Sequence, residues 1–103
     1  MKVRKKPIVV EAYQLVDEYV DQIKRWADDA ITIKSISYLD HRLKMPRARL
    51  EAIVKTLGGT MHAIEGDWII KGVNGEFYAC EDDIFRKSYD IIGSNESDVI
   101  SWC

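Results

Sequence analysis

The side chains that could perform catalysis are few and poorly spaced in this chain. Cys80 is followed directly by three acidic residues, 81–83, and negative neighbours disfavour the thiolate that a catalytic cysteine needs. The two histidines, His41 and His62, lie far from Cys80 in the sequence, so no nucleophile and base form a familiar pattern. We therefore predict a structural role for Cys80, no catalytic residues and no enzymatic activity.

The amino-acid sequence also lacks the known metal-binding and phosphate-binding motifs. The acidic run 81–83 lacks the spacing and the glycine of a calcium loop, and no histidine or cysteine pair has zinc spacing. These acidic residues suit the positive N-terminal end of a helix instead. Residues 72–75 are too short for a phosphate-binding loop and lack its Gly-Lys-Ser/Thr ending. We predict neither a metal nor a cofactor.

Positive charge gathers in two groups, although the chain as a whole is slightly acidic. The formal net charge is −2, whereas nucleic-acid-binding domains usually have a basic excess. The first group is a candidate anion-binding segment, and the second a candidate contact surface for a partner or ligand. A solvated strand edge and a solvated loop would have the same composition. The first group is Lys2, Arg4, Lys5 and Lys6, and the second is Arg42, Lys44, Arg47 and Arg49.

Hydrophobic periodicity predicts the elements of the first half of the chain. Residues 2–13 favour a strand, and residues 16–29 repeat apolar side chains at helical spacing. Alternation resumes at residues 31–39 and predicts a second strand. Residues 40–49 are polar and basic and are interpreted as a loop, or as the start of the next element.

Residues 50–57 are ambiguous, because their apolar spacing fits a helix face or a strand. The Gly58-Gly59 pair would end such a helix, or would form a two-residue hairpin turn into residues 60–64. The strongest local signal is Asn74-Gly75 between two β-rich runs. It predicts a type I′ turn, in which both central residues have positive φ.

The last part of the chain combines a short helix, a polar linker and an apolar end. A helix is predicted to begin near Asp82, and residues 88–92 can close as a strand. We predict one domain over residues 1–93, followed by an extension, 94–103. The apolar end of this extension is either docked on the body or used in a contact with a partner or a second copy. The predicted fold is α+β: a mostly antiparallel sheet of about five or six strands, open or partly closed as a barrel, with two helices packed on it.

Two segments carry a pattern that is more specific than composition. The first is RKKPIVVEA at residues 4–12, and the second is EGDWIIKGVNGEFY at residues 65–78. Cys80, Asp83-Ile84-Phe85 and Tyr89 follow at fixed spacing. Together these segments resemble a widespread family of small phage and prophage proteins. In that family a strand, a turn and a strand precede the GDWI motif, so the resemblance favours a strand for residues 50–57.

The chain departs from that family pattern in two places. Glu65 stands where proline is common, and residues 37–51 look like an insertion that contains the second basic group. The family has no biochemical activity that can be transferred to this chain. The resemblance implies a phage or prophage origin and a location in the cytoplasm of a host bacterium.

Two classes of function remain open. The first is a non-catalytic accessory protein that binds a host protein, for example to inhibit a defence system or an enzyme. The second is binding of a nucleotide signal or a nucleic acid through the two basic groups, with aromatic stacking. No apolar run is long enough for a membrane span, so no membrane contact is predicted. The residues expected to take part beside the second basic group are Trp68, Tyr78 and Trp102, and Trp68 is alternatively a packing anchor.

Overall fold

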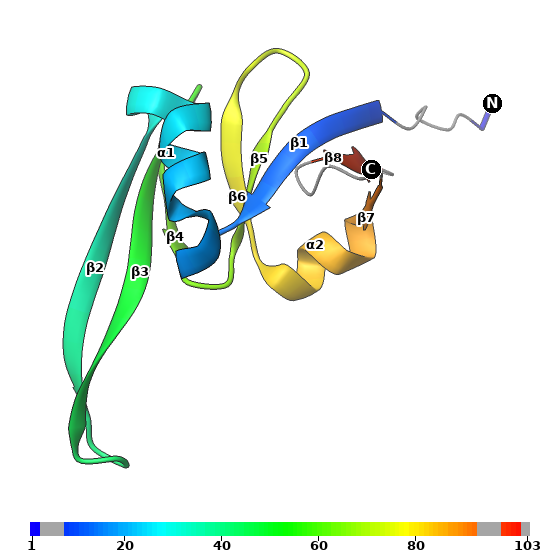
Figure 1. Ribbon diagram of the computed structural model, residues 1–103. Helices are drawn as coiled ribbons and strands as arrows, with labels where there is room; N and C mark the ends of the chain where they lie inside the picture. Colours follow the sequence, from blue (N-terminus) through cyan, green and yellow to red (C-terminus); the bar gives the residue numbers. More distant parts are fainter. Residues whose placement is uncertain (3–7, 93–97, 102–103) are drawn as a thin grey trace.

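Within residues 1–2, 8–92 and 98–101, which the computed structural model describes, the strands form two antiparallel sheets (Figure 1). Sheet A has the order β6-β5-β1-β8-β7, and sheet B the order β2-β3-β4. The predicted α+β class with two helices is confirmed, and its strands are divided between two open sheets. In chain order the elements are β1 (Ile8–Gln14), η1 (Asp17–Tyr19), α1 (Val20–Ala27), η2 (Asp28–Ala30), β2 (Ile31–Asp40), β3 (Met45–Thr56), β4 (Gly59–Ile64), β5 (Trp68–Lys71), β6 (Phe77–Cys80), α2 (Asp82–Ser88), β7 (Tyr89–Ile91) and β8 (Asp98–Ser101).

Strand β5 lies between two hydrophobic clusters, which explains its uninterrupted apolar sequence. Successive strand residues point to opposite faces. Ile69 therefore packs with Leu15 and Ile23 of one cluster, while Trp68 and Ile70 pack on the other side of sheet A. Trp68, Ile69 and Ile70, the first three of the four residues of β5, are all buried, as expected for a strand that is covered on both faces.

Helix α1 presents the amphipathic face that the sequence predicts, over a shorter range. Ile23 and Ala27 are buried against sheet B, and one-turn 3₁₀ segments, η1 and η2, flank the helix. The half-buried Trp26 packs edge-on against Phe77, with ring centroids 5.1 Å apart, and its indole N–H donates to Glu11 at 2.8 Å. Both contacts fix the helix against sheet A.

The structure places residues 50–56 in strand β3 and corrects two turn predictions. The β3–β4 turn consists of Leu57 and Gly58, because Thr56 already pairs with Gly59. After β5, the N–H of Gly75 donates to the carbonyl of Gly72 at 3.0 Å, so Val73 and Asn74 are the central residues of that turn. Of the Asn74-Gly75 pair only Gly75 has positive φ, +81°, so the turn is not type I′.

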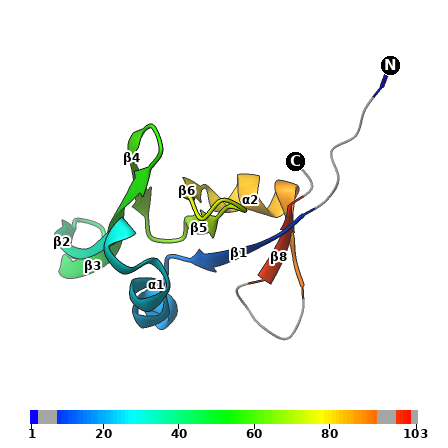
Figure 2. The same cartoon turned by 90° about the horizontal axis from the view of Figure 1, so that it is seen from above.

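Residues 98–101 form a strand inside sheet A, so this part of the predicted extension is docked on the body, which is the first of its two predicted alternatives. Strand β8 pairs with Ile8–Glu11 of β1 on one side and with β7 on the other. Figure 2 shows this β7–β8 pair and sheet B at opposite ends of β1. Strand β8 thus extends sheet A from β1, the first strand of the fold.

Candidate interaction surface on a projecting hairpin

The most distinctive surface of the molecule is a hairpin that extends away from both sheets. We call residues 34–49 the arm; it comprises the outer part of β2, the turn 41–44 and the beginning of β3 (Figure 1). Strand β4 ends at Ile64, which pairs with Glu51, so β3 has only β2 as a neighbouring strand before Leu50. Every side chain from residue 41 to residue 49 is exposed. Of the two interpretations of residues 40–49, the start of the next element holds for residues 45–49 of β3, and only residues 41–44 form a turn.

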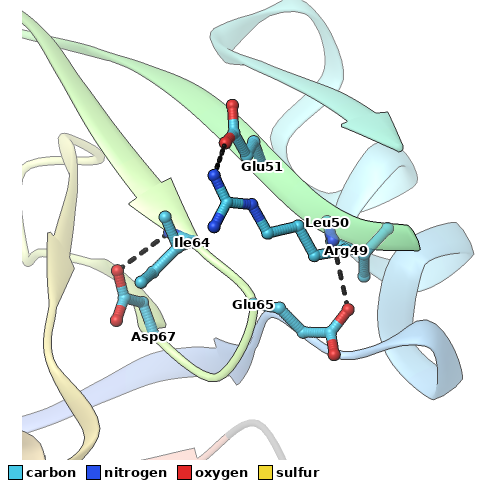
Figure 3. Close-up of polar contacts among 6 residues, drawn as sticks. All are labelled: Arg49, Leu50, Glu51, Ile64, Glu65 and Asp67. Atoms are coloured by element: carbon cyan, nitrogen blue, oxygen red, sulfur yellow. Dashed lines mark hydrogen bonds and ion pairs between the residues drawn. The ribbon is translucent and has the colours of Figure 1, made fainter. Parts of the chain in front are cut away.

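Glu65 fixes the base of the arm to the body (Figure 3). Its carboxylate Oε1 accepts the backbone N–H of Leu50 at 3.1 Å, and its own backbone N–H donates to the carbonyl of Leu50 at 2.9 Å. Proline at this position could make neither contact, because it has no N–H and no carboxylate. Glu65 thus completes the hydrogen bonding of β3 at the point where β4 ends.

The turn that contains Glu65 also joins the two sheets. Asp67 accepts the N–H of Ile64 at 2.9 Å with its side chain and returns its own N–H to the Ile64 carbonyl. Gly66, with φ of +96°, donates to the carbonyl of Leu15, and Leu15 donates to the carbonyl of Asp67, both at 2.8 Å. The arm is therefore anchored at the junction of sheet A and sheet B.

Replacing Glu65 with alanine is expected to destabilise the protein by about 1–2 kcal/mol, because the N–H of the buried Leu50 loses its acceptor. Glu65→Gln keeps an acceptor oxygen and should cost less than half as much. Urea unfolding measures the difference, and amide exchange at Leu50 locates it. Equal losses in the two variants would contradict the role of the carboxylate.

The turn of the arm is closed by Asp40. Its Oδ1 accepts the backbone N–H groups of Arg42 and Leu43 at 3.0 and 3.3 Å, as aspartate does in tight turns. Lys44 completes the turn with φ of +52°. The tip therefore has a defined conformation in which Arg42, Leu43 and Lys44 are exposed together.

One face of the arm is charged, but much of its charge is compensated. Arg47 lies 3.6 Å from Asp40, and Arg49 lies 3.1 Å from Glu51. The guanidinium of Arg49 also lies 5.8 Å from the ring centroid of Tyr38. The two arginines thus do not add up to a concentrated positive patch.

The opposite face of the arm carries no charge. It belongs to the same side of sheet B as the buried residues Leu50, Ala52 and Val54, because strand residues alternate between faces. Beyond the body this side is exposed, and Leu39 is 57% accessible. We call it the uncharged face; it consists of Ser35, Ser37, Leu39, Pro46 and Ala48.

The structure brings the second basic group together on the arm of sheet B, whereas Trp68 and Tyr78 lie in sheet A. Arg42 and Lys44 lie at the tip, and Arg47 and Arg49 on the charged face. Lys2 is exposed. The other residues of the first basic group, Arg4, Lys5 and Lys6, and also Trp102, lie outside the described residues.

Trp68 is a packing anchor, which corrects its candidacy as a binding residue. It is only 6% exposed and stacks on Phe85 with ring centroids 4.0 Å apart and an interplanar angle of 7°. Tyr78 is half-buried, and its hydroxyl lies 3.0 Å from that of Tyr89. Burial and this hydrogen bond raise the pKa of Tyr78 above its ordinary value. Trp68 stabilises the packing of α2 on sheet A, and Tyr78 links β6 to β7 within that sheet.

The indole N–H of Trp68 donates to Asp82 at 2.8 Å and lowers the pKa of that carboxyl, with a further contribution from Arg86. A lowered pKa gives stability that is present above the unfolded-state value and is lost as the pH falls through the folded-state value. We therefore expect Trp68→Phe to flatten the acid limb of stability against pH. Urea midpoints from neutral to acid pH test this, with Asp83→Asn as the control. Parallel acid limbs for wild type and Trp68→Phe would contradict it.

One surface hollow contains side chains that the sequence analysis weighed for catalysis. A groove of about 330 Å³ is lined by His62, Asp67, Cys80 and Glu81 among others, and His62 is exposed there. Cys80 ends β6, as expected of a structural residue. Among the residues that the structure describes, no group of three or more histidine, cysteine or acidic side chains is arranged to hold a metal.

Sequence reasoning missed the apolar part of the arm. Tyr38, Leu39, Leu43 and Met45 are between 42% and 57% exposed, and none of them was singled out. The signal was the alternation that begins at Ile31, which continues to the end of β2. Its continuation indicated a strand much longer than the core requires.

By its geometry the chain is a small α+β protein of two antiparallel sheets with a projecting two-stranded arm. Comparison with protein-family models, with curated proteins and with solved structures finds no match. In the described part of the chain, no helix has the length and apolar character needed to cross a membrane. The functional argument therefore depends on the arm itself.

Proposed function

We propose that the protein is a non-catalytic binding module that engages another protein through its arm. The observation that carries this proposal is the uncharged face, which continues the core side of sheet B beyond the body and exposes Leu39. Leu43 adds a second exposed apolar side chain at the tip. Apolar surface that a fold holds away from its own core is typical of a contact surface.

The geometry of the arm favours a grooved partner. A ribbon of this length extends about 20 Å, and its two faces and its tip are all accessible. A partner that encloses the arm can cover the uncharged face with apolar side chains. Acidic groups at the entrance of the groove would then complement Arg42 and Lys44. Enclosure buries more area than contact with one narrow face, and area of this kind is what specific complexes need.

The resemblance to phage and prophage proteins suggests where that partner is found. In this proposal the protein acts in the cytoplasm of a host bacterium, and the arm occupies a groove on a host protein such as a defence factor or an enzyme. Occupying the groove would inhibit the host protein without any chemical step. This agrees with the charged face of the arm, on which Arg47 and Arg49 pair with acidic neighbours rather than converging on a substrate.

An arm-deleted variant tests the proposal directly. Residues 37–48 are replaced by Asn-Gly, which joins the hydrogen-bonded pair Ile36 and Arg49 by a tight turn and leaves the core pairs of β2 and β3 in register. We expect this variant to stay folded and to lose a stoichiometric host protein that the full chain captures. Capture by the arm-deleted variant as efficient as by the full chain would overturn the proposal.

Single substitutions test the contribution of the uncharged face to binding while the arm itself is kept. Leu39→Asp places a charge on the uncharged face and is expected to weaken capture at least tenfold. Leu57→Asp is the matched control, since Leu57 is 91% exposed in the other turn of sheet B. An equal effect of the two substitutions would count against the uncharged face as the contact surface.

Nucleic-acid binding is the second candidate, and one observation favours it. Within the described residues, the ion pairs of the arm involve Arg47 and Arg49 and leave the charges of Arg42 and Lys44 at the tip uncompensated. Fluorescence anisotropy with labelled oligonucleotides over a salt series tests this candidate. If both residues contact phosphates, replacing them with alanine lowers the salt slope by about 2. No binding at low salt would remove this candidate.

A further inference from the structure

The outer edge of β2 is a second contact surface, independent of the faces of the arm. Strand β2 is the last strand of sheet B, and no other strand of the described residues pairs with its outer edge. Both backbone groups of Leu50 bond to Glu65, on the side of β3 that faces away from β2. Ser35 lies opposite Leu50, so its N–H and C=O point away from β3 in turn.

The same alternation fixes every outward-pointing group along the arm, because the register of β2 and β3 is unbroken. On β2 the N–H and C=O groups of Ile33, Ser35, Ser37 and Leu39 point outward. On β3 the corresponding residues beyond Leu50 are Ala48 and Pro46.

Only one of the two edges of the arm is protected against pairing. On β3, Pro46 presents a nitrogen that has no hydrogen, which is a common way to block strand addition. The edge of β2 has neither a proline nor a bulge, and all its outward N–H groups are available. A strand that lines up with β2 could therefore extend sheet B.

We propose that this strand is the β2 of a second copy, antiparallel to the first and related to it by a two-fold axis at Ser37. In this register Ser37 lies opposite Ser37 of the second copy, and the two exchange backbone hydrogen bonds. Ile36 lies opposite Tyr38 of the second copy, and Lys34 lies opposite Asp40. Aromatic pairs with β-branched residues and pairs of opposite charge both stabilise antiparallel strands, and the symmetry forms each pair twice.

Charge favours a second copy as the occupant. The base of β2 follows the exposed residues Asp28 and Asp29 of η2, whereas the tip carries Arg42 and Lys44. Antiparallel pairing places the basic tip of one copy beside the acidic base of the other. A two-fold axis at Ile36 instead would place Lys34 opposite Tyr38 and lose its ion pair with Asp40. The proposed register is thus the one that matches charge along the whole strand.

The pairing does not depend on the proposed partner contact. It uses the edge of β2 and brings the tip beside the base of the second copy, so a paired arm still presents its uncharged face to a partner but is no longer enclosed by one. Opposite residues in a strand pair point to the same face. Dimerisation would therefore join the uncharged faces of both arms into one continuous surface on a six-stranded sheet.

Cysteine crosslinking tests the two-fold axis. In the dimer the Cα atoms of the two Ser37 residues are about 5.5 Å apart, which suits a disulfide. Ser37→Cys is therefore expected to form a disulfide-linked dimer under mild oxidation, with the bond located by peptide mapping. Ser35→Cys is the matched control, because its two copies would be separated by about 13 Å along the strands. No crosslink in the Ser37→Cys variant, or equal crosslinking in the Ser35→Cys variant, would overturn the proposed register.

Sedimentation equilibrium from micromolar to millimolar concentration tests the dimer without any crosslink. The wild-type chain is expected to dimerise, and Ser37→Pro should raise the dissociation constant roughly tenfold or more, because two hydrogen bonds at the axis are lost. The proline costs the β2–β3 ladder nothing, since the Ser37 N–H points outward. A wild-type chain that remains monomeric throughout would overturn the dimer. A dimer that Ser37→Pro leaves unchanged would overturn its assignment to β2.

Discussion

Replacing Phe85 with alanine is expected to lower the free energy of unfolding by about 3–5 kcal/mol. Phe85 is 1% exposed, and its ring lies between two nearly parallel rings. The centroid distances are 4.0 Å to Trp68 and 4.7 Å to Tyr89. The substitution removes the middle ring of this stack and leaves a cavity between α2 and sheet A. Urea unfolding followed by tryptophan fluorescence measures the loss.

Two further variants show whether the effect comes from the buried ring. Phe85→Leu fills most of the volume and should cost clearly less than alanine. Ile84→Ala removes an apolar side chain that is 49% exposed on the same helix, and it should change stability by less than about 0.5 kcal/mol. A loss below about 1 kcal/mol for Phe85→Ala would contradict the importance of the stack.

Ending the chain at residue 93 is expected to destabilise sheet A by several kcal/mol, out of the roughly 5–15 kcal/mol typical of a domain. Strand β8 is the neighbour of both β1 and β7. Strand β5 pairs with β1 only from Glu11 onward, so Val9 and Val10 would lose their paired strand. Urea unfolding measures the loss of stability, and faster amide exchange in the first half of β1 should accompany it.

A milder truncation separates this structural role from a contact between subunits. A chain that ends at Ser101 keeps β8 and should retain most of the stability. If the chain ending at residue 93 were as stable as wild type and differed only in oligomeric state, residues 94–103 would be an extension that joins subunits. That result would contradict the placement of β8 within sheet A.

The elements that the sequence predicts correctly are those whose signal is local. The helical spacing around Ile23 marks α1, and the resemblance favours a strand for residues 50–57, of which 50–56 lie in β3. Strand β8 was missed because a short segment with two apolar residues, Val99 and Ile100, looks the same in a tail and in a strand. Its main partner, β1, lies at the other end of the chain, and such a distant pairing leaves no trace in the local pattern.

The candidate site was only half predicted, for two physical reasons. Pro46 and the surrounding charges suggested a loop, but a proline is tolerated in β3 where its nitrogen faces the free edge. Trp68 was weighed as an exposed platform on the assumption that one face of its strand meets solvent. The second hydrophobic cluster covers that face, and it forms only when α2 folds back over β5.

Strand β3 runs without interruption from the core to the tip of the arm, from the buried Val54 to the exposed Met45. Motion at the tip is therefore transmitted along the backbone of β3 to the core, and the hydrogen bond from Leu50 to Glu65 holds the base of the arm in place. A partner that restrains the tip should therefore also slow amide hydrogen exchange around Leu50, far from the point of contact. Binding to the arm is thus expected to be measurable at these interior amides, which the partner does not contact.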